Sequence, residues 1–184
     1  MATSIADVAR EKLGTSTPGG ELIDEIIGSK QNKILVGVNG PDRLIAGKKG
    51  YYQMTGNGGP DQYVLAPSDN DFDQLLDGNL LKSNNADRIT GFSHLEGDTL
   101  VLGKQSFQGI NPKNYAFEIL YTWKNLNAAS SKGNKNKILA KVEDEYSFLF
   151  YDSNGGKEGF GDNGGRFANL GVNFSLQQSD ILFI

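Results

Sequence analysis

The chain has 184 residues, a formal net charge of -4 and no cysteine. This length suits one domain that can bury a hydrophobic core. The acidic balance disfavours a nucleic-acid partner, and the lack of cysteine excludes disulfides and thiolate metal sites. Glycine accounts for 24 residues, against a usual share of about 7%. With the many asparagines, it indicates numerous tight turns rather than a flexible linker.

The first segment, residues 1–18, is predicted to contain a short helix over 4–13, followed by a linker. This helix is expected to cap the open end of the fold that the following residues form, where an uncovered strand edge would invite aggregation. Apolar residues recur there at the spacing of one helical face, and Gly14 can end the helix. These residues are Ile5, Val8, Ala9 and Leu13. The segment lacks the basic and apolar regions of a secretory signal peptide. No stretch of the sequence approaches the 18 consecutive apolar residues of a membrane-spanning helix.

Residues 19–66 repeat with a period of nine. The units GGELIDEII, GSKQNKILV and GVNGPDRLI follow one another from Gly19, and with one inserted residue the frame continues through AGKKGYYQM and TGNGGPDQYVL. The sixth place holds aspartate in three of these five units, and the eighth place is apolar. The aspartates are Asp24, Asp42 and Asp61, and the apolar residues include Ile26, Leu35, Leu44 and Tyr63.

This frame resembles the RTX (hemolysin-type) nonapeptide, G-G-x-G-x-D-x-U-x, of secreted calcium-binding proteins. The resemblance implies a mainly β fold, in which six residues of each unit form a turn and three form a short strand. Two units then make one coil of a short parallel β-roll, with residue U pointing inward. Calcium lies between stacked turns, where backbone carbonyls and aspartate supply an all-oxygen shell.

The spacing of the aspartates predicts a roll that binds calcium on one edge. Turns two units apart stack on the same edge, at about the 4.8 Å strand spacing. Asp24, Asp42 and Asp61 are therefore expected on one edge. The opposite edge carries Lys33 and Tyr52, which supply no carboxylate.

Two calcium sites are predicted on the aspartate edge. The better one lies between turns 37–42 and 56–61. Its candidate residues are Asp42, Asp61, Gly37, Asn39, Gly40, Gly56, Gly58 and Gly59. The poorer one includes Asp24 and lies between turns 19–24 and 37–42, because Leu22 stands in the place of the fourth glycine. The alternatives are a roll that no longer binds metal and a chance frame in a glycine-rich loop.

The stretch ADRITGFSHLEGDTLVL, residues 86–102, resembles the D-x-I-x-D-F…G-D-x-L-x-L element that commonly follows RTX repeats. The matching residues are Asp87, Phe92, Gly97, Asp98, Leu100 and Leu102, whereas Gly91 stands where an aspartate is expected. The resemblance makes Asp87 and Asp98 candidate calcium ligands. Their positions equally suit the polar ends of half-buried strands.

The sequence offers no recognisable catalytic arrangement, so we do not expect an enzyme. His94 is the only histidine, and it is predicted to be an exposed loop residue. Tyr121 and Trp123, in EILYTW, alternate like the buried face of a strand. A hydrolase acting through acidic residues would need two carboxylates that converge in a cleft.

Residues 67–184 are predicted to form a β-rich C-terminal secretion module. The segment DEYSFLFYDSNGGKEGFGDNGGRFANLG resembles a pattern near the C-termini of many RTX-type proteins, notably cyanobacterial ones. The matching residues are Leu149, Tyr151, Asp152, Asn154, Gly155, Gly159, Gly161, Phe167, Ala168 and Leu170. The tail from Asp180 to Ile184 resembles the uncleaved signal of type I secretion substrates. It also suits a buried final strand.

The combined resemblance implies a secreted protein, extracellular or on the cell surface, that binds calcium ions. The type I secretion apparatus would export it unfolded, and calcium would drive its folding outside the cell. Only 18 residues precede the repeats, so no catalytic domain is expected ahead of them; a whole small protein and the C-terminal end of a larger one both remain open. The alternative function is a cell-surface or polysaccharide-binding module. A groove lined by Tyr51, Tyr52, Tyr121 and Trp123 would favour it.

Overall fold

The computed structural model describes residues 4–15, 21–47, 51–67, 72, 86–133, 136–144, 146–172 and 175–184. Within these residues the chain forms two sheets with twelve strands in total, together with two α-helices and two short 3₁₀ helices, η2 (His94–Glu96) and η3 (Gln178–Asp180). The prediction of a mainly β fold with a short N-terminal helix is confirmed. None of the helices described is long and apolar enough to cross a membrane.

The first sheet has five strands, all parallel, in the order β1-β3-β5-β7-β12. They are β1 (Asp24–Ile27), β3 (Asp42–Ile45), β5 (Gln62–Leu65), β7 (Thr99–Leu102) and β12 (Ile181–Phe183).

The second sheet has seven strands in the order β2-β4-β6-β11-β10-β9-β8. They are β2 (Ile34–Val36), β4 (Gln53–Thr55), β6 (Asp87–Thr90), β11 (Gly165–Leu170), β10 (Ser147–Asp152), β9 (Lys137–Val142) and β8 (Ala116–Leu120). The four from β2 to β11 are parallel. Strand β10 is antiparallel to both of its neighbours, and β8 is parallel to β9.

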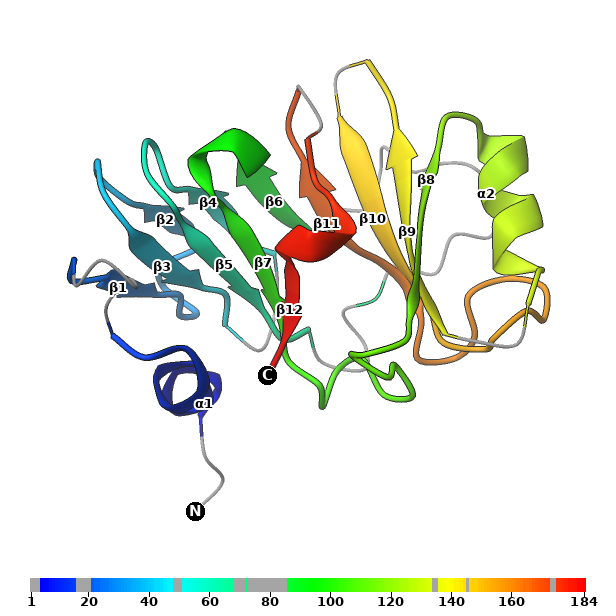
Figure 1. The fold of residues 1–184 in the computed structure, drawn as a ribbon, viewed down its shortest axis with the longest axis horizontal. Helices are drawn as coiled ribbons and strands as arrows, with labels where there is room; N and C mark the ends of the chain where they lie inside the picture. The colour runs from blue at the N-terminus through cyan, green and yellow to red at the C-terminus, as the bar shows by residue number, and fades with distance from the viewer. Residues whose placement is uncertain are drawn as a thin grey trace.

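From β1 to β7 the chain alternates between the two sheets (Figure 1). The nine-residue frame explains this path, because each unit supplies one turn and one strand of three or four residues. The apolar residue in the eighth place points into the space between the sheets. Leu35, Leu44, Met54 and Tyr63 are accordingly fully buried.

One large hydrophobic core fills the space between the sheets and includes residues from both halves of the sequence, such as Leu44, Ile89 and Tyr151. Strands β6, β7, β11 and β12 extend the same two sheets that β1 to β5 begin. The boundary expected near residue 66 therefore falls within both sheets.

Helix α1 (Ile5–Leu13) begins with a capping box, in which Ser4 and Asp7 bond to each other's backbone amides. Ala6 packs with Ile45, Val64 and Val101 on the outer face of the first sheet. The predicted helix is thus present, but its place differs from the expected one at the open end of the roll. The reason is that the outward residues of β3, β5 and β7 are apolar as well.

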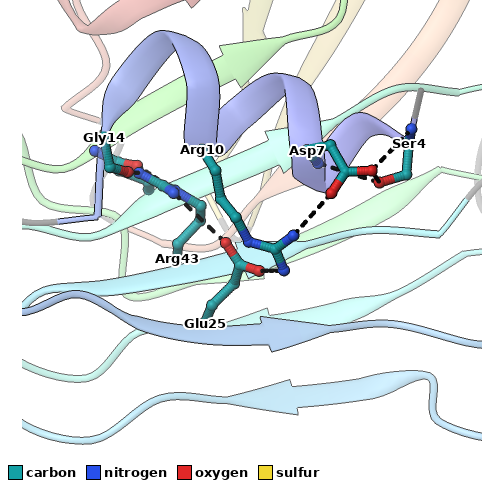
Figure 2. Close-up of polar contacts among 7 residues, drawn as sticks. Ser4, Asp7, Arg10, Gly14, Glu25 and Arg43 are labelled. Carbon is teal, nitrogen blue, oxygen red and sulfur yellow. Dashed lines mark hydrogen bonds and ion pairs between the residues drawn. The ribbon is translucent and has the colours of Figure 1, made fainter.

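Arg43 on β3 ties this helix to the sheet (Figure 2). Its side chain is 1% exposed and donates to the Gly14 carbonyl oxygen (2.7 Å) and to Gln62 Oε1 (2.7 Å). Glu25 on β1 contacts both Arg43 and Arg10 of the helix. The pKa of Arg43 is lowered by burial, while the Glu25 carboxylate acts in the opposite direction.

Helix α2 (Trp123–Ser130) covers the outer face of the second sheet, where Leu126 packs with Leu139 and Phe150. The prediction that Tyr121 and Trp123 form a strand's buried face is wrong. Strand β8 ends at Leu120, and Tyr121 is 71% exposed. The Thr122 hydroxyl accepts a hydrogen bond from the Asn125 amide (3.1 Å) and so starts a helix at Trp123.

Candidate metal centre at one edge of the sheets

Each connection that leads from the second sheet back to the first lies at the same edge of the molecule. Asp24 and Asp42 are register partners in β1 and β3. Asp61 and Asp98 directly precede Gln62 and Thr99, which are partners in β5 and β7. The predicted shared edge of the first three aspartates is confirmed, and Asp98 extends the set. We call Asp24, Asp42, Asp61 and Asp98 the aspartate row.

Hydrogen bonds link three members of the row, Asp42, Asp61 and Asp98, in succession. The Asp42 amide donates to Asp61 Oδ1, and the Asp61 amide donates to Asp98 Oδ1, both at 2.9 Å. Other carboxylate oxygens close their own turns: Asp42 Oδ2 accepts from the Val38 amide, and Asp98 Oδ2 accepts from the Ser93 amide, both at 2.8 Å. The carboxylates of Asp42, Asp61 and Asp98 therefore each already order the backbone around them.

Two carboxylate oxygens in the middle of the row accept no hydrogen bond from the described residues. Among the residues that the structure describes, Asp42 Oδ1 and Asp61 Oδ2 are buried without a hydrogen-bond partner. Their residues are 1% and 0% exposed. A buried polar atom without a partner costs free energy, and a buried charge costs more. These oxygens therefore provide acceptor capacity that the protein itself does not use.

The electrostatics of the row favour protonation or a bound cation. Burial, followed by the negative charges of Asp98, Asp42 and Glu96, raises the pKa of Asp61 to about 7, although the Asp42 amide opposes the shift. Burial also raises the pKa of Asp42 and of Asp98. The folded protein thus holds several carboxylates in a place where their negative charge is poorly compensated.

The two turns of the better predicted site stack closely. The Gly40 amide donates to the Gly58 carbonyl (2.6 Å), and Asn57 Nδ2 donates to the Gly37 carbonyl (2.8 Å). At Gly56 a Cβ atom would overlap the Asp61 carboxylate.

The remaining candidates of this site lie in the same two turns. At Gly37 a Cβ atom would overlap the Asp42 carboxylate, and at Gly59, where φ is +123°, it would meet the Gly40 backbone. Asn39 Oδ1 comes within 3.6 Å of the position that a Cβ would take at Gly58. The structure therefore brings the residues of the better predicted site together.

Asp24 and Asp87 occupy different surroundings. Asp24 is exposed at the end of the row, and its turn, 19–24, lies partly outside the described residues. Asp87 lies on the opposite edge, where its Oδ1 accepts the Tyr52 amide (2.8 Å). Lys33 lies beside them, with Nζ 4.3 Å from the centre of the Tyr52 ring. The opposite edge thus does carry a carboxylate, that of Asp87, which lies in the coil after the nine-residue repeats.

In the described part of the chain, no three acidic or histidine side chains converge to hold a metal ion. The row supplies one carboxylate per turn, so a cation between two turns would depend on backbone carbonyl oxygens for the rest of its shell. Oxygen ligands of this kind suit Ca²⁺, which takes six to eight of them in flexible geometry. The spare oxygens of Asp42 and Asp61 are of the ligand type that such a shell requires.

A contact between His94 and Asp180 has no counterpart in the sequence patterns. His94 Nδ1 lies 2.8 Å from Asp180 Oδ1, and Asp180 Oδ2 accepts the Gln177 amide (2.8 Å). The pair joins the turn before β7 to the turn before β12. His94 is therefore half-buried and paired, not an exposed loop residue. No local motif signals a contact between residues 86 positions apart.

The four aromatic residues proposed to line a groove do not gather at one place. Tyr52 is 1% exposed and precedes β4, whereas Tyr121 and Trp123 follow β8 at the far end of the second sheet. In the sheet order, β4 and β8 are five strand positions apart, or about 24 Å at the usual strand spacing. Comparison with protein-family models and with curated protein sequences gave no match for this chain.

Proposed function

We propose that the chain is a secreted RTX-type calcium-binding protein, built on a short β-roll and exported by a type I secretion system. The observation that carries this proposal is the aspartate row, with the partnerless buried oxygens of Asp42 and Asp61 in stacked glycine-rich turns. The alternation of short parallel strands between two sheets supports the β-roll.

Calcium would hold the turns at 37–42 and 56–61 together. Asp42 and Asp61 would contribute carboxylate oxygens, and the backbone carbonyls of Gly37, Asn39, Gly40, Gly56, Gly58 and Gly59 are the further candidate ligands. The ion would supply the positive charge that the row lacks. Because an ion bound only by the folded state stabilises that state, millimolar calcium would favour folding.

The C-terminal tail fits export before folding. In the folded state, Asp180 and Ile181 are buried, and residues 181–183 form β12 beside β7. A secretion apparatus could therefore read the tail from Asp180 to Ile184 only in the unfolded chain. Replacing residues 181–184 with serine should keep the protein inside a host that expresses a type I system, whereas serine at Gln177 and Gln178 should not.

The first experiment compares the chain in EGTA and in millimolar calcium by far-UV circular dichroism with thermal melting, and measures binding by calorimetry. Calcium should raise the melting temperature or convert an unfolded chain to β structure. Asp42→Asn and Asp61→Asn should abolish this response, and Lys33→Ala on the opposite edge should retain it. Equal structure and stability in both solutions, without binding heat, would leave the roll a metal-free scaffold.

A further inference from the structure

One end of both sheets carries exposed apolar side chains. Residues 21–38, here called the first coil, contain β1 and β2, which are the terminal strands of the two sheets at that end (Figure 1). The outward side chains of β2 are Ile34, 61% exposed, and Val36, 54% exposed. Three further apolar residues of the coil are also exposed, namely Leu22, Ile27 and Val38. Natural edge strands usually carry charges or proline instead.

The backbone of the first coil is ready to pair with another strand. The Lys33 carbonyl and the Gly37 amide bond to β4, so by strand alternation the polar groups of Ile34 and Val36 face away from it. In the same way, the Asp24 and Gly28 amides bond toward β3, which leaves those of Glu25 and Ile27 facing the open side. Among the described residues of the chain between α1 and β1, the Ile23 amide, just before β1, donates to the Thr15 carbonyl oxygen (3.1 Å).

The other end of the sheets is built differently. There Phe183 of β12 packs edge-on against Tyr115, with ring centres 5.1 Å apart. The second sheet continues past this point to β10, β9 and β8, because it has seven strands against five in the first sheet. Copies stacked head to tail could not match both sheets at once. A second copy that pairs with both sheets of the first coil must therefore do so through its own first coil.

We propose that the first coil is the interface of a homodimer with two-fold symmetry. The axis passes through Leu35 and Ile26, which occupy the same place in their nine-residue units and face each other across the core. Strand β2 then pairs antiparallel with β2 of the second copy, and β1 with β1. Such closed two-fold pairing is the commonest route to a dimer.

Charge selects this axis over the other two-fold arrangement. One edge of the first coil carries Glu21 and Asp24, and the other carries Lys30 and Lys33. An axis across the two sheets places the acidic edge of one copy beside the basic edge of the second copy. An axis along the strands would instead bring acid to acid and base to base, which is unfavourable.

The side chains of β2 complement one another in this register. Ile34 lies opposite Val36 of the second copy, and Val36 opposite Ile34. Four exposed β-branched side chains thereby form one apolar cluster, and directly opposed pairs of this type stabilise antiparallel strands.

The oligomeric state tests the proposal. The full chain, in millimolar calcium, should sediment as a dimer of the 19.9 kDa chain, and Ile34→Lys should sediment as a monomer with an unchanged circular dichroism spectrum. The matched control is Leu95→Lys, since Leu95 is 94% exposed outside the coil and its replacement should leave the dimer intact. A monomeric wild type, or a dimer that survives Ile34→Lys, would overturn the proposal.

A cross-link tests the register independently of Ile34→Lys. The chain has no cysteine, so Ile34→Cys and Val36→Cys can each be introduced alone. Directly opposed residues have Cα atoms about 5.5 Å apart, within disulfide range, whereas a residue and its own symmetry mate would be about 7–8 Å apart. Mild oxidation should give a covalent dimer from the mixed variants and little from either alone. The absence of a disulfide in the mixture would contradict this register.

Discussion

The Asp61 main-chain amide donates to the Asp98 carboxylate at 2.9 Å, although 37 positions separate the two residues. The same link joins Asp42 to Asp61 across 19 positions. The same hydrogen-bonded link between turns thus continues to Asp98, although the nine-residue period of the sequence ends at residue 66. The aspartate row is consequently a continuous structural element, and its charge should govern how stability responds to pH.

In EGTA, the free energy of unfolding should fall as pH rises. The pKa of Asp61 is raised from 3.8 to about 7 in the folded protein, so between these values the folded state binds a proton that the unfolded state has lost. The contribution of Asp61 to the free energy of unfolding is fully present below about pH 4. At about pH 7 it is reduced by up to a few kcal/mol. The pKa values of Asp42 and Asp98 are raised as well and act in the same direction.

Urea unfolding across this pH range measures the effect. Asp61→Asn, which carries no charge, should be more stable than the wild type at pH 7 in EGTA and should show a shallower pH dependence. The exposed Asp144 supplies the control, because Asp144→Asn should keep the wild-type slope. Parallel curves for Asp61→Asn and the wild type would contradict this account of the row.

Gly56→Ala should destabilise the protein, whereas Gly58→Ala should not. A Cβ at position 56 overlaps the Asp61 carboxylate, which is already held by the Asp42 amide. A Cβ at position 58 meets only Asn39 Oδ1, at an ordinary 3.6 Å. We expect a loss of about 1–3 kcal/mol for Gly56→Ala and a change within about 0.5 kcal/mol for Gly58→Ala. Thermal denaturation of the two variants tests the difference, and equal losses would argue against it.

Arg43→Ala should weaken the attachment of α1 far more than Arg10→Ala. Arg43 is buried and bonds to Gly14, Gln62 and Glu25, so its removal leaves a carbonyl and a carboxylate without their buried partner. Breaking such a pair costs about 3–5 kcal/mol. The Arg10 side chain is 42% exposed, and surface pairs contribute about 0–1 kcal/mol. Limited proteolysis near the helix and urea unfolding would report both effects.

His94→Ala should loosen β12 without unfolding the protein. The His94 ring is bonded to Asp180, directly before the strand, and losing such a bond costs about 1–2 kcal/mol. Hydrogen exchange should quicken at the Ile184 amide, which bonds to the Leu102 carbonyl. Leu95→Ala, at a neighbouring exposed position, should leave that exchange rate unchanged. Equal rates in the two variants would show that the pair does not hold the strand.

Much of the N-terminal half is predictable because its order is local. A period of nine, with an apolar eighth place, fixes which residues point inward, and it places Asp24, Asp42 and Asp61 on one edge. The position of α1 did not follow from the sequence, since the apolar face of a helix does not specify which surface it covers. The alternation at Tyr121 and Trp123 predicts a strand wrongly, because the Thr122 side chain caps a helix that begins at Trp123.

The site could be predicted in part for the same reason. Its glycines and two central aspartates lie in the regular repeats, but Asp98 joins the row only after the longer connection between β5 and β6. Asp87 has a similar sequence context yet lies on the opposite edge, because β6 belongs to the second sheet. The link between His94 and Asp180 depends on β12 pairing with β7, which no repeat or spacing encodes.

The two sheets are assembled from pairings of very different sequence range. Asp24 and Asp42 pair across 18 positions, whereas Asp87 pairs with Ala168 across 81. Bringing distant segments together costs more chain entropy and slows folding. The early coils should therefore form first and serve as a template, while the joining of β11 to β6 and of β12 to β7 should limit the rate of folding.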